Sequence, residues 1–148
     1  MTEYNTNLAA EFYVLSALHR LGMDAMLTLG NKKSVDIVVV REEGDAVTID
    51  VKGVADKNPW PVDNVREAQG RHFLAFVCFV GKIATVEVSP EVWVVPSARL
   101  APLVYHAPGG RRVVQYHQLR REGAEFFGAW RLLAGGPSPT DHPELEVR

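Results

Sequence analysis

Apolar residues near the start of the chain recur at helical spacing. Residues 7–21 are expected to form a helix, with Asn7 as its N-cap and Gly22 as its stop. The apolar positions share one stripe on a helical wheel: Leu8, Phe12, Leu15 and Leu18. Glu11 falls within that stripe, which is an unusual position for a carboxylate.

Short strand-like runs follow this helix. The pattern predicts strands at 26–29, 34–40 and 47–53, with turns at 30–33 and 42–45 between them. Because both turns are short, the three strands are expected to form an antiparallel meander.

The second half of the chain mixes strands and helices. The continuous apolar run at 73–80 predicts a strand buried on both faces. Further strands are expected at 83–88, 92–95 and 112–116. A short helix is expected from Ser97 to about residue 105, and a last helix at 125–133. This order predicts an α/β (α+β) fold, a mixed central β-sheet flanked by helices. We expect one domain at 1–134 and a flexible Gly- and Pro-rich tail at 135–148.

The composition is that of an ordinary globular protein. The 148 residues are 47% apolar and 23% charged, with a formal net charge of -2. No apolar run approaches the length of a membrane span, and no signal peptide is visible. Cys78 is the only cysteine, so a cytoplasmic location is expected. Six arginines between Arg99 and Arg131 give that stretch a local charge of +4. They form either a phosphate-binding patch or an ordinary solvated surface.

Two carboxylates and a lysine stand out in the predicted meander. Asp36 interrupts an apolar strand, where an unpaired charge is costly to bury. Asp50 and Lys52 are two residues apart, so they share one face of their strand. If the two strands are neighbours, these side chains converge, and Glu11 can approach them from the helix. Paired carboxylates beside an ammonium are the elements of a divalent-metal phosphodiesterase site.

Each of these residues also has a simpler interpretation. Asp50 and Lys52 could line the solvated face of an amphipathic strand. Asp36 could accept a turn amide or pair with Lys33. Glu11 could lie in the first turn of its helix, where the macrodipole favours an acid. Trp60, between two prolines, is either an anchor packed on the sheet or a wedge facing nucleic acid.

The combination of Glu11, Asp36 and Asp50-Val51-Lys52 resembles the PD-(D/E)XK nuclease superfamily. The similarity is greatest to its Holliday-junction-resolvase-like and uncharacterised bacterial branches, which carry a small residue and then Ala-Glu in the first helix. It covers about residues 5–53. One departure is Val35, which stands where the proline of the signature is expected.

The resemblance implies a restriction-endonuclease-like core and a metal-dependent nuclease that hydrolyses phosphodiester bonds in DNA. Asp36, Asp50, the carbonyl of Val51 and Glu11 would hold Mg²⁺, with Mn²⁺ as a substitute. Lys52 would orient the attacking water or offset charge on the phosphate. Gln69 resembles a downstream glutamine of some members, at an unconvincing spacing.

Two further expectations accompany this assignment. Small nucleases of this kind often dimerise, and Trp93 and Tyr105 are candidate apolar surface residues for a homodimer. One alternative function is a catalytically inactive nuclease-fold module that binds nucleic acid or a protein partner. Another is a metal-free structural domain in which Lys52 bridges Asp36 and Asp50.

Overall fold

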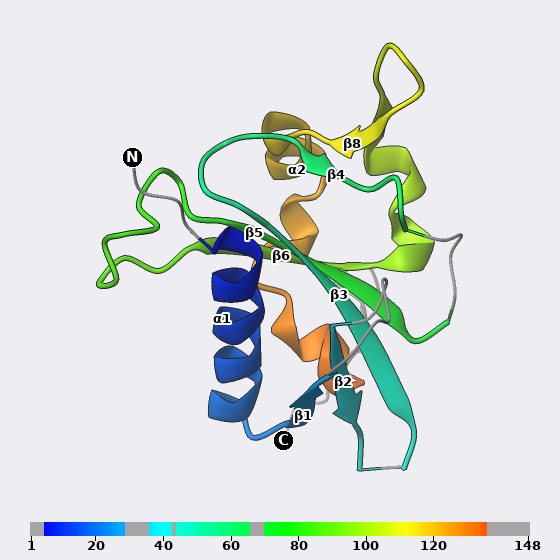
Figure 1. Ribbon diagram of the computed structural model, residues 1–148. Helices are drawn as coiled ribbons and strands as arrows, with labels where there is room; N and C mark the ends of the chain where they lie inside the picture. Colours follow the sequence, from blue (N-terminus) through cyan, green and yellow to red (C-terminus); the bar gives the residue numbers. More distant parts are fainter. Residues whose placement is uncertain (1–4, 29–35, 43, 66–69, 136–148) are drawn as a thin grey trace, which may run out of the picture.

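The structure is a computed structural model that describes residues 5–28, 36–42, 44–65 and 70–135 (Figure 1). The predicted turn at 30–33, Gln69 and all but the first residue of the predicted tail lie outside the described residues. No helix of the described part is long and apolar enough to cross a membrane.

The N-terminal half forms the predicted helix and antiparallel meander. Helix α1 spans Thr6–Arg20, and it is followed by β1 (Asp24–Leu27), β2 (Ile37–Val40) and β3 (Ala46–Val54). Strand β2 pairs antiparallel with both β1 and β3. The N-cap residue is Asn5 and not Asn7, and its side chain makes no capping hydrogen bond.

Two more strands complete a five-stranded mixed sheet. Strand β5 (His72–Cys78) runs parallel to β3, and β6 (Glu91–Pro96) pairs antiparallel with β5. The sheet order is β1-β2-β3-β5-β6. Strand β5 is buried on both faces, as its unbroken apolar run predicts. The mixed sheet with flanking helices confirms the predicted fold class.

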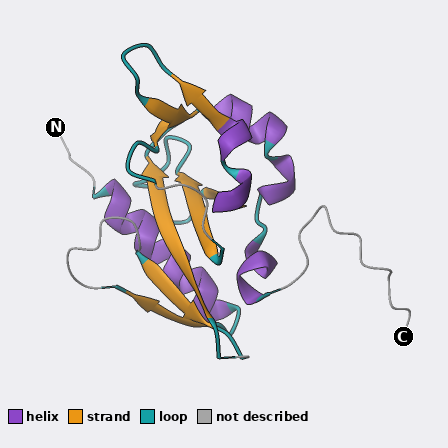
Figure 2. Ribbon diagram, turned by 90° about the vertical axis from the view of Figure 1, so that its right-hand side faces the viewer, coloured by secondary structure: helices purple, strands orange, loops and turns teal. Residues whose placement is uncertain are grey.

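A second, three-stranded sheet lies beside one end of β3 and β5. It contains β4 (Trp60–Pro61), β8 (Arg112–Val114) and β7 (Val104–His106), in the order β4-β8-β7. The remaining segments are α2 (Tyr116–Glu122) and 3-10 turns, which lie away from α1 (Figure 2). The 3-10 turns are Ser97–Arg99, Ala101–Leu103, Ala124–Phe126 and Trp130–Ala134.

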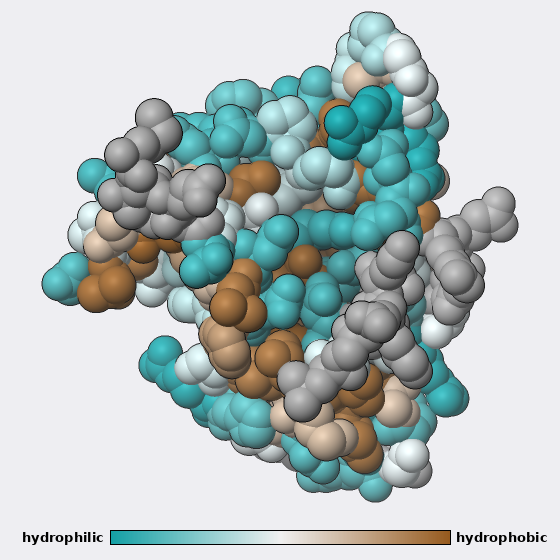
Figure 3. Space-filling view, in the orientation of Figure 1, coloured by the Kyte–Doolittle hydropathy of each residue, from teal (hydrophilic) through white to brown (hydrophobic). Residues whose placement is uncertain are grey.

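Helix α1 packs on β3 through a smaller face than the one predicted. Its buried residues are Ala10, Val14 and Leu18, whereas Leu8 and Phe12 are exposed. Figure 3 shows apolar surface along this helix. A Cβ atom on Gly53 of β3 would lie 2.7 Å from the Cβ of Ala10, so two small residues set the contact. This close approach rotates the large apolar side chains toward solvent and places Glu11 beside the sheet.

Several other local predictions are wrong. Residues 83–88 form turns and not a strand, with Val86 exposed. The expected last helix is a pair of 3-10 turns separated by Gly128, whose φ of 61° breaks a right-handed helix. The segment after Ser97 forms 3-10 turns without a side-chain cap.

The aromatic residues of the second half form a buried cluster. Trp60 is completely buried, and its ring lies 5.3 Å from Phe76 and 6.0 Å from Trp93. Its indole Nε1 donates to the carbonyl of Val77 at 3.1 Å. Trp60 is therefore a packed anchor, and Trp93 is a core residue that cannot serve as the expected dimer surface; Tyr105 is 42% exposed.

Candidate active site

Asp36 directly precedes β2 and links the start of that strand to the middle of β3. Its backbone N–H donates to the carbonyl of Ile49 at 2.8 Å, although Ile49 lies opposite Ile37 in the ladder, so this bond is offset by one residue from the regular pairing. Its side-chain Oδ2 accepts the Val51 N–H at 2.7 Å. The carboxylate therefore accepts a strand amide and not a turn amide, whereas Lys33, its other expected partner, lies outside the described residues.

Asp50 is a buried carboxylate in the centre of the sheet. Asp50 is only 2% exposed, so it does not line a solvated face of the strand. Oδ1 lies 3.7 Å from the Lys52 ammonium, and Oδ2 has no hydrogen-bond partner within the described part of the chain. Burial raises its pKa to about 7, and the Asp36 charge acts in the same direction; the Lys52 charge opposes both. A buried, unpartnered carboxylate oxygen is unusual unless a ligand uses it.

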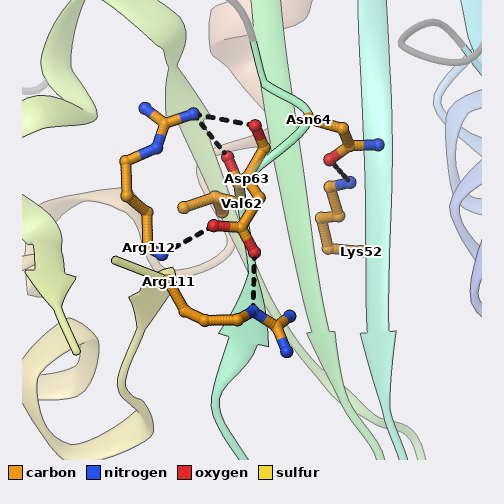
Figure 4. A network of polar contacts seen from close by, with 6 residues as sticks. All are labelled: Lys52, Val62, Asp63, Asn64, Arg111 and Arg112. Carbon is orange, nitrogen blue, oxygen red and sulfur yellow. Dashed lines mark hydrogen bonds and ion pairs between the residues drawn. The ribbon is translucent and has the colours of Figure 1, made fainter. Parts of the chain in front are cut away.

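Lys52 points to the same side as Asp50, as two-residue spacing requires. Its Nζ atom donates a hydrogen bond to Oδ1 of Asn64 at 2.8 Å (Figure 4). The ammonium lies between an amide oxygen and a carboxylate and is not inserted between Asp36 and Asp50. This arrangement leaves open space beside both carboxylates.

Glu11 approaches from α1 and is partly buried. Because the helix begins at Thr6, Glu11 lies in the second turn, beyond the reach of a first-turn interaction with the macrodipole. Burial raises its pKa, and the negative charge of Asp36 adds to this effect. The two carboxylates are therefore near enough to influence each other.

All four residues line one cleft of about 450 Å³ between α1, β3 and the loop after β4. We call it the carboxylate cleft. Strand β4 and the loop after it contribute four further lining residues: Trp60, Pro61, Asp63 and Asn64. The structure thus brings together the side chains that the sequence placed on three separate elements.

The donor set of the carboxylate cleft suits a hard divalent cation. Mg²⁺ prefers one or two carboxylates and keeps several waters, and the free Oδ2 of Asp50 offers one such ligand. However, no group of three or more Asp, Glu, His or Cys side chains in the described residues is arranged to hold a metal by itself. A bound cation would therefore rely on water for part of its coordination shell.

Sequence reasoning missed Asn64 and its neighbours. Asp63 accepts the backbone N–H of Arg112 at 2.7 Å and Nε of Arg111 at 3.0 Å (Figure 4). These bonds lower the pKa of Asp63. The contact depends on pairing between β4 and β8, about fifty residues apart in sequence, and no local pattern signals it.

Three of the six arginines in the proposed basic patch form ion pairs with carboxylates. Arg99 pairs with Glu125 at 2.7 Å, Arg111 with Asp63, and Arg121 with Glu122 at 3.1 Å. The local excess of positive charge therefore does not form a continuous surface of free guanidinium groups.

Comparison with known proteins relates the chain to a nuclease at the level of the fold. No protein-family model matches the sequence, and no curated protein matches it. The fold is similar to the solved structure of a bacterial homing endonuclease, I-Ssp6803I, with a TM-score of 0.55. The match covers 91% of this chain and 94% of that chain, at 16% sequence identity. At this identity the similarity shows a shared fold and nothing of the chemistry.

Proposed function

We propose that this protein is a Mg²⁺-dependent nuclease of the PD-(D/E)XK type that hydrolyses phosphodiester bonds in DNA. One observation carries the proposal: Asp36, Asp50, Lys52 and Glu11 line a single cleft, in which a buried Asp50 oxygen lacks a partner. The fold shared with a homing endonuclease supports the nuclease class.

The residues of the carboxylate cleft would have distinct roles. Asp50, Asp36 and the carbonyl of Val51 would hold the cation, and Glu11 would bind it directly or through water. The cation, when bound, would lower the pKa of a water molecule and stabilise charge on the phosphate. Lys52 would orient the attacking water or offset the charge that develops on the phosphate. Its ammonium, 3.7 Å from Asp50, lies close enough to act beside the same ligand.

The direct test is cleavage of several forms of DNA by the purified protein with Mg²⁺ or Mn²⁺. Asp50→Asn and Lys52→Gln should each abolish detectable cleavage, because one removes a ligand charge and the other the ammonium. Asp24→Asn and Lys82→Gln make the same chemical changes at exposed positions and should retain activity. Cleavage that persists in both cleft variants would show that another site, or a contaminant, is responsible.

A second candidate function is a nuclease-fold module that binds nucleic acid or a protein without cutting. It is favoured by the hydrogen bond that occupies Asp36 Oδ2 and by the absence of a three-ligand cluster in the described residues. Calorimetric titration with Mn²⁺ separates the two candidates. Binding that Asp50→Asn abolishes supports the enzyme, whereas no measurable binding supports the module.

A homodimer in the cytoplasm is part of the same proposal. Two copies would cut the two strands of a duplex, and Tyr105 remains an exposed aromatic residue that could contribute to their contact. The thiol of Cys78 is buried and forms no disulfide, which fits a reducing compartment. Light scattering of the full chain measures the oligomeric state. A monomeric mass at assay concentrations would refute the proposed homodimer.

A further inference from the structure

Lys52 has two neighbours that differ in distance. Its Nζ atom lies 2.8 Å from the amide oxygen of Asn64, which is hydrogen-bond length, and 3.7 Å from Asp50 Oδ1, which is not. The amide of Asn64 therefore fixes where the ammonium lies, although the carboxylate carries the greater charge.

Asn64 itself lies on a segment that is tied to the second sheet. The guanidinium Nη2 of Arg112 donates to the carbonyls of Val62, Asp63 and Val65 at 3.0–3.1 Å. The carboxylate of Asp63 accepts bonds from Arg112 and Arg111 in return (Figure 4). We call Asp63, Arg111 and Arg112 the arginine clamp. It holds the backbone on both sides of Asn64.

We propose that Asn64 is a positioning residue that holds the Lys52 ammonium in the carboxylate cleft, and that the arginine clamp fixes Asn64 for this task. The consequence for catalysis rests on the proposed nuclease function, whereas the positioning itself does not. The Lys52–Asn64 hydrogen bond thus links the lysine to the segment that the arginine clamp holds.

The physical reason lies in the freedom of a lysine side chain. A four-carbon stem has many rotamers, and an ammonium without a fixed acceptor samples several of them. If Asn64 lost its oxygen, the ammonium would either close the gap to Asp50 or swing toward the mouth of the cleft. In both cases it would leave the position from which it can serve a bound phosphate or water.

The test of positioning uses the metal-free full chain with a chelator present. A held ammonium gives a resolved ¹H–¹⁵N correlation for Nζ in NMR spectra at low temperature and mildly acidic pH, which Lys52→Gln assigns by its loss. Asn64→Leu removes the acceptor while keeping the branched shape of the side chain, and it should remove or displace this signal. Asn64→Asp keeps an acceptor oxygen and should retain the Lys52 signal. The control variant Asn58→Leu, on an exposed loop, should also retain that signal. A missing wild-type signal, or one unchanged in Asn64→Leu, would overturn the proposal.

The role of the clamp is tested with Arg112→Lys. This change keeps the charge but removes the planar group that reaches three carbonyls, so it should weaken or displace the same signal. An unchanged signal would show that Asn64 stays in place without the clamp.

The kinetic test separates this inference from the proposed function. Asn64→Leu should lower kcat about tenfold or more while KM for DNA stays within about threefold, since misplacing a reacting group affects the chemical step. Asn64→Asp should recover most of kcat. A wild-type protein that never cleaves DNA refutes the nuclease proposal and leaves the NMR result valid. Equal kcat in wild type and Asn64→Leu refutes the catalytic part alone.

Discussion

The Val51 amide donates a 2.7 Å hydrogen bond to the carboxylate of Asp36. The bond joins β3 to the residue before β2. It holds the carboxylate of Asp36, one proposed metal ligand, against the backbone that follows Asp50, another proposed ligand. A side chain thus replaces a main-chain acceptor at the end of the ladder, and the site is built into the pairing of the two strands.

Substitutions of Asp36 should therefore separate stability from chemistry. Asp36→Ala leaves the largely buried Val51 N–H without an acceptor and should lower the free energy of unfolding by about 1–3 kcal/mol. Asp36→Asn keeps an acceptor oxygen and should lose less stability, yet it should lose metal affinity and any DNA cleavage. Urea denaturation followed by circular dichroism measures the first effect. Equal stability losses in the two variants would mean that the Val51 bond contributes little.

The raised pKa of Asp50 should make the folded protein less stable as pH rises. Its carboxyl has a pKa of about 7 when folded and an ordinary value of 3.8, so the folded state binds more protons between these values. Because stability falls with pH wherever the folded state holds the extra proton, the loss should accumulate from about pH 4 to 7 and then level off. It should amount to a few kcal/mol at most, on the order of 1.4 kcal/mol per pKa unit.

Asp50→Asn isolates this effect, since it removes the titrating group and leaves the other carboxylates. In the presence of a chelator, the variant should be more stable than wild type at pH 8, and the difference should shrink toward pH 4. The comparison between the two proteins matters, because Asp63, with its lowered pKa, acts in the opposite direction. A pH-independent difference would show that Asp50 is already ionised at low pH.

A divalent cation should stabilise the folded protein through Asp50. A ligand that binds only the folded state adds about 2.7 kcal/mol at a free concentration one hundred times its Kd. Mg²⁺ or Mn²⁺ at pH 8 should therefore raise Tm in wild type and in Asp24→Asn, but not in Asp50→Asn. Differential scanning fluorimetry measures the shift. An equal rise in Asp50→Asn would place the cation elsewhere.

The sequence predicts the elements that hold the site better than it predicts their contacts. Helix α1, the meander and β5 follow from periodicity and short turns, and the Asp50–Lys52 spacing places both side chains on one side of β3. The packing face of α1 does not follow, because it is decided by the fit of Ala10 against Gly53. A hydrophobic pattern marks the large apolar side chains as the buried face, whereas here two small residues determine how α1 packs on β3.

The wall of the carboxylate cleft could not be predicted for a different reason. Asn64 is held by Arg112, which bonds to the residues on both sides of it because β4 pairs with β8. Strands of two and three residues leave almost no pattern in a sequence, so their pairing is invisible before the fold is known. The signals for Asp36 and Asp50 are stronger, because Asp36 interrupts an apolar strand and Asp50 shares one strand face with Lys52.

The contact between Ala10 and Gly53 should control both stability and the position of Glu11. In Gly53→Ala the new Cβ would lie 2.7 Å from Ala10 Cβ and 3.2 Å from the Thr6 carbonyl oxygen, so the start of α1 must move away from β3. Such overpacking typically costs about 1–3 kcal/mol. Because Glu11 follows Ala10 directly, the same shift should widen the carboxylate cleft and weaken Mn²⁺ binding. Gly70→Ala, where an added Cβ meets nothing within 4 Å and φ is not positive, is the matched control and should change neither property. If Gly53→Ala lost stability but kept its full Mn²⁺ affinity, Glu11 would not take part in holding the cation.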